Sequence, residues 1–216
     1  NFHNTKERYK SFINAIERNK ANRLDNVINE VNFIIERKSD TSILVDLLQK
    51  GKLPLRVTHN DTKISNILMD AKTKEGICVI DLDTIMPGLS LYDFGDAIRS
   101  GATHVSEDEK DLNKVFIDLE FFEAFTKGFL EGTANSLTEK EIELLPMAVK
   151  IITLEQGIRF LTDYLNGDVY YKTNYNDQNL DRTRTQLKLV KDIEEKLNEM
   201  KNIVNKCLSN NIVEVW

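Results

Sequence analysis

A group of polar residues between Val57 and Leu68 has residue types and a spacing suited to phosphoryl transfer. His59, Asp61 and Asn66 form a His-x-Asp-x-x-x-x-Asn pattern that stands directly before a short apolar run. A carboxylate such as that of Asp61 can accept the proton of an attacking hydroxyl, and an amide oxygen such as that of Asn66 is a hard ligand suited to Mg²⁺. The same pattern also occurs by chance as a polar turn with a buried histidine, so its surroundings decide between the two interpretations.

The surroundings favour phosphoryl transfer. A second apolar run, 77–80, ends on Asp81, and a further acid, Asp83, follows two residues later. If the turn between the runs is centred between Thr73 and Lys74, Asn66 lies opposite Asp81, across one strand spacing of roughly 5 Å. Two oxygen ligands that close can share one metal ion. We therefore predict that Asn66 and Asp81 are magnesium ligands and that Asp61 is the catalytic base.

Four further residues are expected to assist this site. Lys63 follows the predicted base by two residues, where its ammonium group can reach the phosphoryl group in transit. His59 and Asp83 are expected to contact and orient the residues that bind metal and substrate. Asp93-Phe94-Gly95 spells the metal-binding tripeptide of protein kinases, but the place after the returning strand belongs to Asp81. We therefore assign Asp93 to a helix start, where it braces the loop.

Composition argues against several classes of function. The 216 residues are 41% hydrophobic and 30% charged, as in soluble globular domains, and the net charge of −6 argues against a broad basic surface for nucleic acid. No run reaches the roughly 18 apolar residues that span a bilayer. Neither Cys78 nor Cys207 belongs to a CxxC pair, and we expect both to be buried, reduced thiols in a cytoplasmic protein.

Helical periodicity dominates the elements that must position this loop. Apolar residues recur at three- and four-residue steps over 6–49, 91–101, 119–129, 139–165 and 187–207. Thr138 and Glu141 form a capping box, an interruption is expected at Pro146, and Asn166-Gly167 ends that helix. The expected β-structure is one hairpin over 67–80, and Pro87-Gly88 is expected to form a turn. The predicted fold is mainly α with a small β-hairpin, in a single domain of residues 1–216.

Taken together, the motifs resemble the aminoglycoside phosphotransferase superfamily of protein-kinase-like enzymes, and within it most closely the N-acetylhexosamine 1-kinases. The resemblance is carried by His59-Asn60-Asp61-Thr62-Lys63, Ile80-Asp81-Leu82-Asp83-Thr84, Pro87 to Asp96 and Gly157 to Asp163. It extends over most of 55–190 and implies the C-terminal lobe of a kinase-like fold. It also implies ATP and Mg²⁺ as cofactors, and the anomeric hydroxyl of N-acetylglucosamine or N-acetylgalactosamine as phosphoryl acceptor.

The same resemblance implies two sugar-binding residues. Arg159 and Tyr170 stand about where these sugar kinases use an arginine and a tyrosine to grip the acetamido sugar. An arginine can donate a forked pair of hydrogen bonds, and a tyrosine can stack on a sugar or hydrogen-bond to it. The alternatives are an interhelical salt bridge for Arg159 and an ordinary loop aromatic for Tyr170.

One part of a kinase is missing from the sequence. None of the nine glycines lies in a GxGxxG setting, and no β-rich segment precedes the helices. We therefore expect that the N-terminal, ATP-binding lobe is absent from this chain and acts as its partner, so that the chain alone binds ATP poorly and turns over little. Two alternatives stay open: another acceptor, such as an aminoglycoside, choline or homoserine, and a non-catalytic, pseudokinase-like scaffold.

Overall fold

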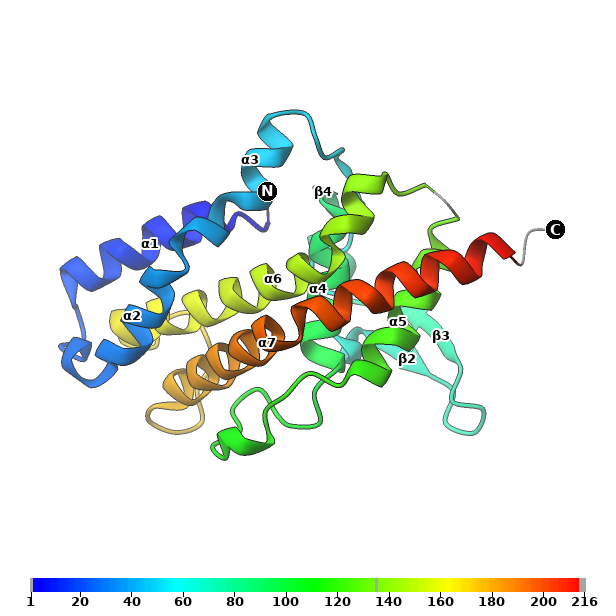
Figure 1. Ribbon diagram of the computed structural model, residues 1–216. Helices are drawn as coiled ribbons and strands as arrows, with labels where there is room; N and C mark the ends of the chain where they lie inside the picture. The colour runs from blue at the N-terminus through cyan, green and yellow to red at the C-terminus, as the bar shows by residue number, and fades with distance from the viewer. Residues whose placement is uncertain (1, 135, 214–216) are drawn as a thin grey trace.

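The computed structural model describes residues 2–134 and 136–213, and helices predominate in this part of the chain (Figure 1). The α-helices are α1 (Thr5–Arg18), α2 (Ile28–Glu36), α3 (Ile43–Gln49), α4 (Ser90–Gly101), α5 (Leu119–Gly132), α6 (Glu139–Asn166) and α7 (Gln178–Val213). The strands are β1 (Arg56–Thr58), β2 (Ile67–Met69), β3 (Gly76–Val79) and β4 (Met86–Gly88). The expectation of a mainly helical fold with little β-structure is confirmed.

The central helix is α6, and α1, α4 and α7 pack against it (Figure 1). It begins at the predicted capping box, in which Thr138 and Glu141 satisfy each other's backbone N–H groups, and it ends at Gly167, whose φ is 96°. Both boundaries are confirmed. The interruption expected at Pro146 is wrong, because the helix continues through this residue. Burial of the flanking side chains, such as Leu145, offsets the roughly 3 kcal/mol that a proline inside a helix costs.

Close packing of α4 on α5 and α6 accounts for two residues of the Asp93-Phe94-Gly95 tripeptide. Phe94 is fully buried, and its ring centroid lies 6.0, 5.8 and 5.1 Å from those of Phe122, Phe125 and Phe129 in α5. The predicted apolar stripe of α5 is therefore confirmed as core. A Cβ on Gly95 would stand only 2.7 Å from the carbonyl oxygen of Ala148 in α6, so a larger residue would force the two helices apart.

Two small antiparallel sheets lie beside the helices. β1 pairs with β4, with Arg56 opposite Gly88 and Thr58 opposite Met86, so the turn expected at Pro87-Gly88 is wrong. A proline is tolerated there because a two-stranded sheet has only edge strands, which need no N–H from it. β2 pairs with β3, which confirms the predicted hairpin.

The register of the β2–β3 hairpin differs from the predicted one by a single residue. Ile67 lies opposite Val79, and the N–H of Ile80 donates to the carbonyl oxygen of Asn66 at 2.9 Å. Asn66 therefore faces Ile80 rather than Asp81. The turn causes this shift, since Lys74 adopts a left-handed conformation with φ of 63° and the pairing is irregular after Leu68.

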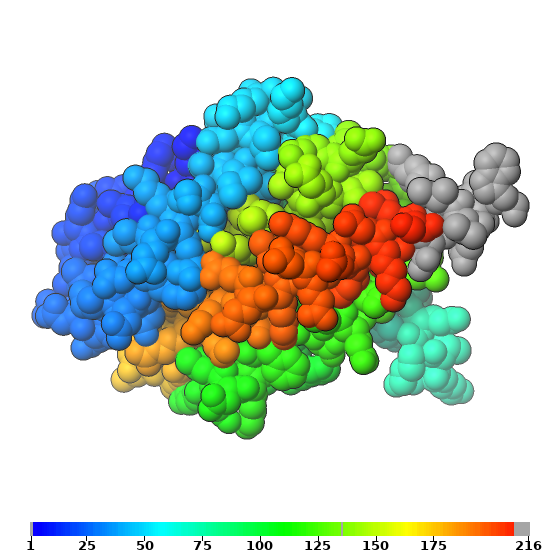
Figure 2. All heavy atoms as spheres, in the orientation of Figure 1, coloured from blue at the N-terminus to red at the C-terminus, as the bar shows by residue number. Residues whose placement is uncertain are grey.

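Figure 2 shows the hairpin standing away from the helical body. All residues of β2 and β3 are exposed, and Cys78 is exposed with them. The expectation of a buried Cys78 is thus wrong, because an apolar run predicts a strand without saying what covers its faces. Cys207 is buried on the core face of α7, as predicted.

A partly buried ion pair fastens β1 to the start of α6. Arg56 donates from Nε and Nη2 to the two carboxylate oxygens of Glu141, at 2.6 and 2.7 Å. Ser90 and the backbone N–H of Thr138 donate to the same carboxylate, at 2.7 and 2.8 Å. Burial alone would raise the pKa of Glu141, but Arg56 and these hydrogen bonds outweigh burial and lower the pKa to about 2. The Arg56–Glu141 ion pair fixes the position of β1, from which the chain enters the loop at 59–66.

Candidate active site

Asp93, in the first turn of α4, binds the backbone of the loop between β1 and β2. The backbone N–H groups of His59 and Asn60 donate to the two oxygens of this carboxylate, at 2.8 and 2.7 Å. The hydroxyl of Thr62 donates to the carbonyl oxygen of Asp93 at 2.6 Å. Burial raises the pKa of Asp93, although the two N–H groups act in the opposite direction. The structure therefore places Asp93 under the loop, as a brace.

Asn60 gives the loop its sharp bend. Its φ is 66°, a left-handed conformation that asparagine tolerates better than most residues. The side-chain amide of Asn60 donates to the carbonyl oxygen of Thr84 at 3.0 Å, and the hydroxyl of Thr84 donates back to the carbonyl oxygen of His59 at 2.6 Å. The bend turns the next residue, Asp61, away from the sheet and toward the pocket described below.

Asp61, Lys63, Asn66 and Asp81 converge at the end of the hairpin. The ammonium group of Lys63 lies 2.8 Å from Oδ2 of Asp61 and 4.0 Å from Oδ2 of Asp81. The amide nitrogen of Asn66 donates to the same Asp61 oxygen at 3.0 Å and to the Asp61 carbonyl oxygen at 2.8 Å. Asp81 turns back toward this group because its own φ is 64°. The hydrogen bond to Asp61 raises the pKa of Lys63, against the effect of burial.

The contacts of His59 fix its tautomer. Its Nε2 lies 3.0 Å from the carbonyl oxygen of Ile80 and must donate, so Nδ1 is the acceptor for the backbone N–H of Asp61 at 3.3 Å. His59 thus ties the foot of the hairpin to Asp61. Asp83 is exposed and makes none of the hydrogen bonds or ion pairs found among the described residues. The structure does not bring Asp83 to the loop, and the neighbouring Thr84 makes the contacts instead.

The donor set suits a magnesium ion. Because the amide nitrogen of Asn66 faces Asp61, its amide oxygen is left to bind a cation, and the half-exposed carboxylate of Asp81 offers a second hard oxygen. Within the described residues, no three His, Cys, Asp or Glu side chains gather into a metal-binding group. Mg²⁺ is commonly held by one or two protein oxygens together with substrate phosphates and water, and Asn66 and Asp81 would provide two such oxygens.

Asp61 opens into a pocket of about 250 Å³ that also contains Arg159 and Tyr170. The guanidinium carbon of Arg159 lies 6.0 Å from the centre of the Tyr170 ring and 5.6 Å from that of Tyr171. Arg159 hydrogen-bonds to Gln156 at 3.1 Å and forms no salt bridge within the described part of the chain. Both predicted sugar-contact residues therefore lie in one pocket with the predicted base.

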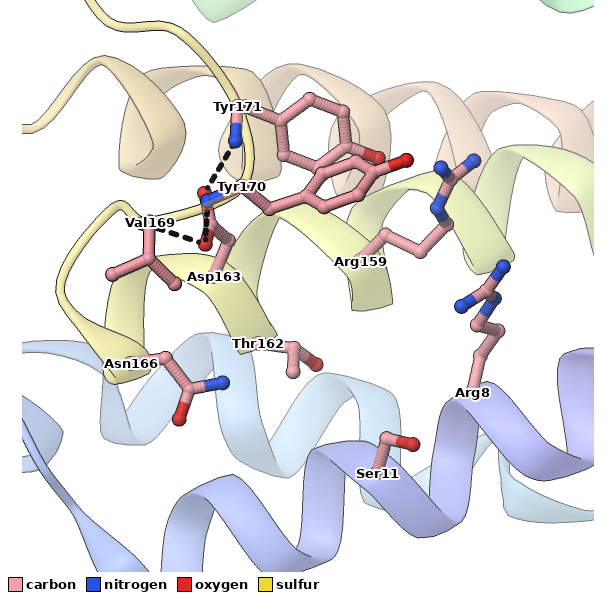
Figure 3. A pocket seen from close by; sticks show the side chains of 9 residues that line it. All are labelled: Arg8, Ser11, Arg159, Thr162, Asp163, Asn166, Val169, Tyr170 and Tyr171. Atoms are coloured by element: carbon pink, nitrogen blue, oxygen red, sulfur yellow. Dashed lines mark hydrogen bonds between the residues drawn. The ribbon is translucent and has the colours of Figure 1, made fainter.

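The loop that carries Tyr170 is anchored from α6. The carboxylate of Asp163 accepts hydrogen bonds from the backbone N–H groups of Val169, Tyr170 and Tyr171, at 2.9, 2.9 and 3.0 Å (Figure 3). Arg8 and Arg159 both line the adjoining hollow, whose side chains Figure 3 draws and whose volume is about 200 Å³. Tyr170 is 72% exposed, so its ring is free to meet a ligand.

Several residues of the pocket were not predicted from the sequence. Among them are buried charged groups, namely His3, Asp96, Arg99 and Glu155. Asp96 pairs with Arg99 at 2.9 Å, and Arg99 pairs with Glu107 at 2.7 Å. The only available signal was Asp96 itself, as the last residue of the motif that begins at Pro87. Arg99 and Glu155 lie just outside the motifs that end at Asp96 and begin at Gly157, and His3 is distant in sequence from any motif.

Comparison with known protein families identifies the family of this chain. No helix in the described residues is both long enough and apolar enough to cross a membrane. Residues 14–125, which are just over half of the chain and include the loop, the hairpin and α4, match the family model described as the phosphotransferase enzyme family. The chain therefore belongs to the phosphotransferase enzyme family.

Proposed function

We propose that this protein transfers the γ-phosphate of ATP to a sugar hydroxyl, with the anomeric hydroxyl of an N-acetylhexosamine as the acceptor. The observation that carries the proposal is the placement of Asp61. Its carboxylate meets Lys63 and Asn66 on one side and opens on the other into a pocket that holds Arg159 and Tyr170. A kinase needs its base, its cation site and its acceptor pocket at one place, and this arrangement supplies all three.

In the proposed reaction, Asp61 orients the acceptor hydroxyl and takes its proton. The hydroxyl oxygen forms a bond to the γ-phosphorus, the bond from that phosphorus to the bridging oxygen breaks, and ADP leaves with the electron pair. Lys63 stabilises negative charge on the transferred group. Asn66 and Asp81 would hold Mg²⁺, which neutralises charge on the phosphates. His59 and Asp93 keep the loop in position through their hydrogen bonds.

Arg159 and Tyr170 are proposed to select the sugar. A guanidinium group can donate two hydrogen bonds to the acetamido carbonyl oxygen or to neighbouring hydroxyls, and the exposed ring of Tyr170 can cover an apolar sugar face. Since Arg159 has no carboxylate partner among the described residues, its donors are available for this contact.

A further lobe of the same protein is proposed to bind ATP and to cover the hairpin. The hairpin carries exposed apolar side chains, among them Leu68 at 49%, Ile77 at 65% and Val79 at 52%, and Val57 in β1 is 84% exposed. An apolar surface of this kind marks a site of contact with another domain or partner. Cys78 lies between Ile77 and Val79 and is exposed, so the rate of its alkylation reports whether another lobe covers the hairpin. Alkylation of Cys78 is expected to be fast in residues 1–216 and at least tenfold slower in the full-length protein.

The function is tested by a phosphorylation screen with the full-length protein. N-acetylglucosamine, N-acetylgalactosamine, glucose, an aminoglycoside, choline and homoserine are each offered with ATP and Mg²⁺, and ADP release is measured. We expect turnover of an N-acetylhexosamine, its loss by about 10²- to 10⁴-fold in Asp61→Asn, and little turnover by residues 1–216 alone. Preferential turnover of an aminoglycoside, choline or homoserine would refute the acceptor. No turnover and no Mg²⁺ binding would favour a non-catalytic scaffold.

A matched pair of acceptors tests the role of Arg159. Arg159→Lys keeps the positive charge but removes the planar fork, so it should raise KM for N-acetylglucosamine and leave the weak turnover of glucose unchanged. Equal losses for both sugars would show that Arg159 does not read the acetamido group.

A further inference from the structure

His3 lies buried beside the loop that carries Asp61, although it belongs to the segment that precedes α1. Its side chain is 6% exposed and lines the pocket described above. Nδ1 lies 2.8 Å from a carboxylate oxygen of Glu155 in α6, and Nε2 lies 3.0 Å from the carbonyl oxygen of Asn60. The ring also packs against Tyr92 of α4, with centroids 5.1 Å apart. One histidine thus connects three separate parts of the chain.

The contacts of His3 define its protonation state. A carboxylate and a carbonyl oxygen are both acceptors, so both ring nitrogens must donate, and only the imidazolium has two N–H groups. A neutral ring would leave one nitrogen lone pair facing an oxygen lone pair in a buried place. Glu155 is 1% exposed, and the hydroxyl of Thr5 donates to its second oxygen, so the negative partner is itself fully bonded.

Asn60 is the residue at which this contact matters most. The N–H of Asn60 donates to Asp93, and the carbonyl oxygen of Asn60 accepts from His3. The peptide groups on both sides of Asn60, whose backbone conformation is left-handed, are therefore fixed. The next residue is Asp61. We propose that protonated His3 is a positioning residue, which fixes the carbonyl group of Asn60 and thereby the carboxylate of Asp61. This inference rests on the proposed role of Asp61 as base.

Groups of both charges surround His3, and their net effect favours the charged ring. Glu155 and Arg159 face it from α6, Tyr92, Asp93 and Asp96 from α4, and Asp61 and Lys63 line the same pocket. Burial alone lowers the pKa of His3, but the hydrogen bond and charge of Glu155 outweigh burial, and the pKa is raised above its ordinary 6.5. Burial raises the pKa of Glu155, but His3 and Thr5 outweigh it, and the pKa falls below its ordinary 4.5.

The sign of the pH effect follows from these two directions. The stabilisation by protonated His3 is complete below pH 6.5 and is lost as the pH rises through the raised pKa of the folded state. That from Glu155 is complete above pH 4.5 and is lost as the pH falls through its lowered pKa. The contact is therefore strongest between these two values and weakens on the alkaline side as His3 loses its proton.

The first test is an NMR titration of the unmodified chain, which has only three histidines. The ring signals of His3 are assigned with His59→Gln and His104→Gln, and the amide signals of Asn60 and Asp61 are followed together with them. We expect His3 to titrate above pH 6.5, and the two amides to shift with the same midpoint. A neutral His3 at pH 6, or loop amides that ignore its titration, would overturn the inference. This test needs no enzymatic activity, so it is separate from the test of the proposed function.

Glu155→Gln separates the hydrogen bond from the charge. The introduced amide can donate to Nδ1 of a neutral His3, which then still donates from Nε2 to Asn60. In the full-length enzyme, kcat of wild type should decline as the pH rises through the pKa of His3. The kcat of Glu155→Gln should stay within about threefold of wild type at pH 7 and should lack this decline. His3→Ala, which removes the contact, should lower kcat about tenfold below the raised pKa of His3, approach wild type above it, and leave KM for ATP unchanged. His104→Gln is the control, since His104 is exposed and pairs with Asp118. If kcat of both Glu155→Gln and His3→Ala declined at alkaline pH as it does in wild type, the inference would be contradicted.

Discussion

Replacing Asp93 by asparagine separates the two roles that the Asp93-Phe94-Gly95 tripeptide can have. In this structure the Asp93 carboxylate accepts two short hydrogen bonds from the backbone of the loop, at 2.8 and 2.7 Å. An asparagine keeps one acceptor oxygen, but its NH₂ group then faces the other backbone N–H. One hydrogen bond is lost and one N–H is left without a partner. The loop is thereby released on one side of Asn60.

The expected magnitude follows from these contacts. A hydrogen bond to a charged group contributes about 1.5–3 kcal/mol. Burial disfavours the charged carboxylate and raises the pKa of Asp93. Removing the charge therefore offsets part of the free energy lost with the hydrogen bond. We expect Asp93→Asn to lower the free energy of unfolding by about 1–2 kcal/mol. If the loop geometry is needed in the transition state, the same energy lowers kcat by about 5- to 30-fold.

Three measurements decide between the roles. Urea unfolding of residues 1–216 gives the stability, and the full-length enzyme gives kcat and the Mg²⁺ concentration for half-maximal rate. Asp93→Asn should lower stability and kcat without changing the Mg²⁺ requirement, whereas Asp81→Asn should raise the Mg²⁺ requirement at least tenfold with little change in stability. Asp25→Asn is the control, because Asp25 is exposed in a short 3-10 helix (Leu24–Val27) far from the loop in sequence. A raised Mg²⁺ requirement with unchanged stability in Asp93→Asn would refute the assignment of Asp93 as a brace.

Three further predictions concern the framework around the site. The stability difference between wild type and Glu141→Gln should be about 2 kcal/mol at pH 7, after allowance for solvent screening, and should shrink as the pH falls from 4.5 toward 2, because the pKa of Glu141 is depressed to about 2. Equal differences at pH 7 and pH 3 in urea unfolding would contradict this. Gly95→Ala should lower the free energy of unfolding by about 1–3 kcal/mol, while Gly128→Ala, with open space around its Cβ, should raise it by up to about 1 kcal/mol. In residues 1–216, iodoacetamide should modify Cys78 at least tenfold faster than Cys207, whose pKa is raised by burial; equal rates, measured by mass spectrometry, would show that the hairpin is covered.

Local sequence signals predicted the elements well. The capping box at Thr138, the end of α6 at Gly167 and the aromatic stripe of α5 depend on residues close together in the chain, and the structure has all three. The assignment of Pro146 failed because the cost of an internal proline is a local quantity, whereas the packing that offsets it comes from other helices. The assignment of Cys78 failed for a related reason, since the apolar pattern of a strand does not reveal whether anything covers it.

What the sequence determined by itself is the set of groups that act at the loop. The spacing of Asp61, Lys63 and Asn66 within one loop, with Asp81 at the end of the returning strand, brings these side chains together even though the predicted register was off by one residue. A short loop has few possible backbone conformations, so residues that are close in sequence there are also close in space.

Only the tertiary structure decided how that loop is held. Asp93 was recognisable as a support from its position at a helix start, but its two hydrogen bonds to the loop required α4 to pack against that loop. The contact between His3 and Glu155 joins residues 152 positions apart, and no local pattern marks either of them. A buried ion pair of this kind exists only because α1 and α4 pack against α6, which brings a charge, its partner and a backbone carbonyl group into one place from which water is excluded.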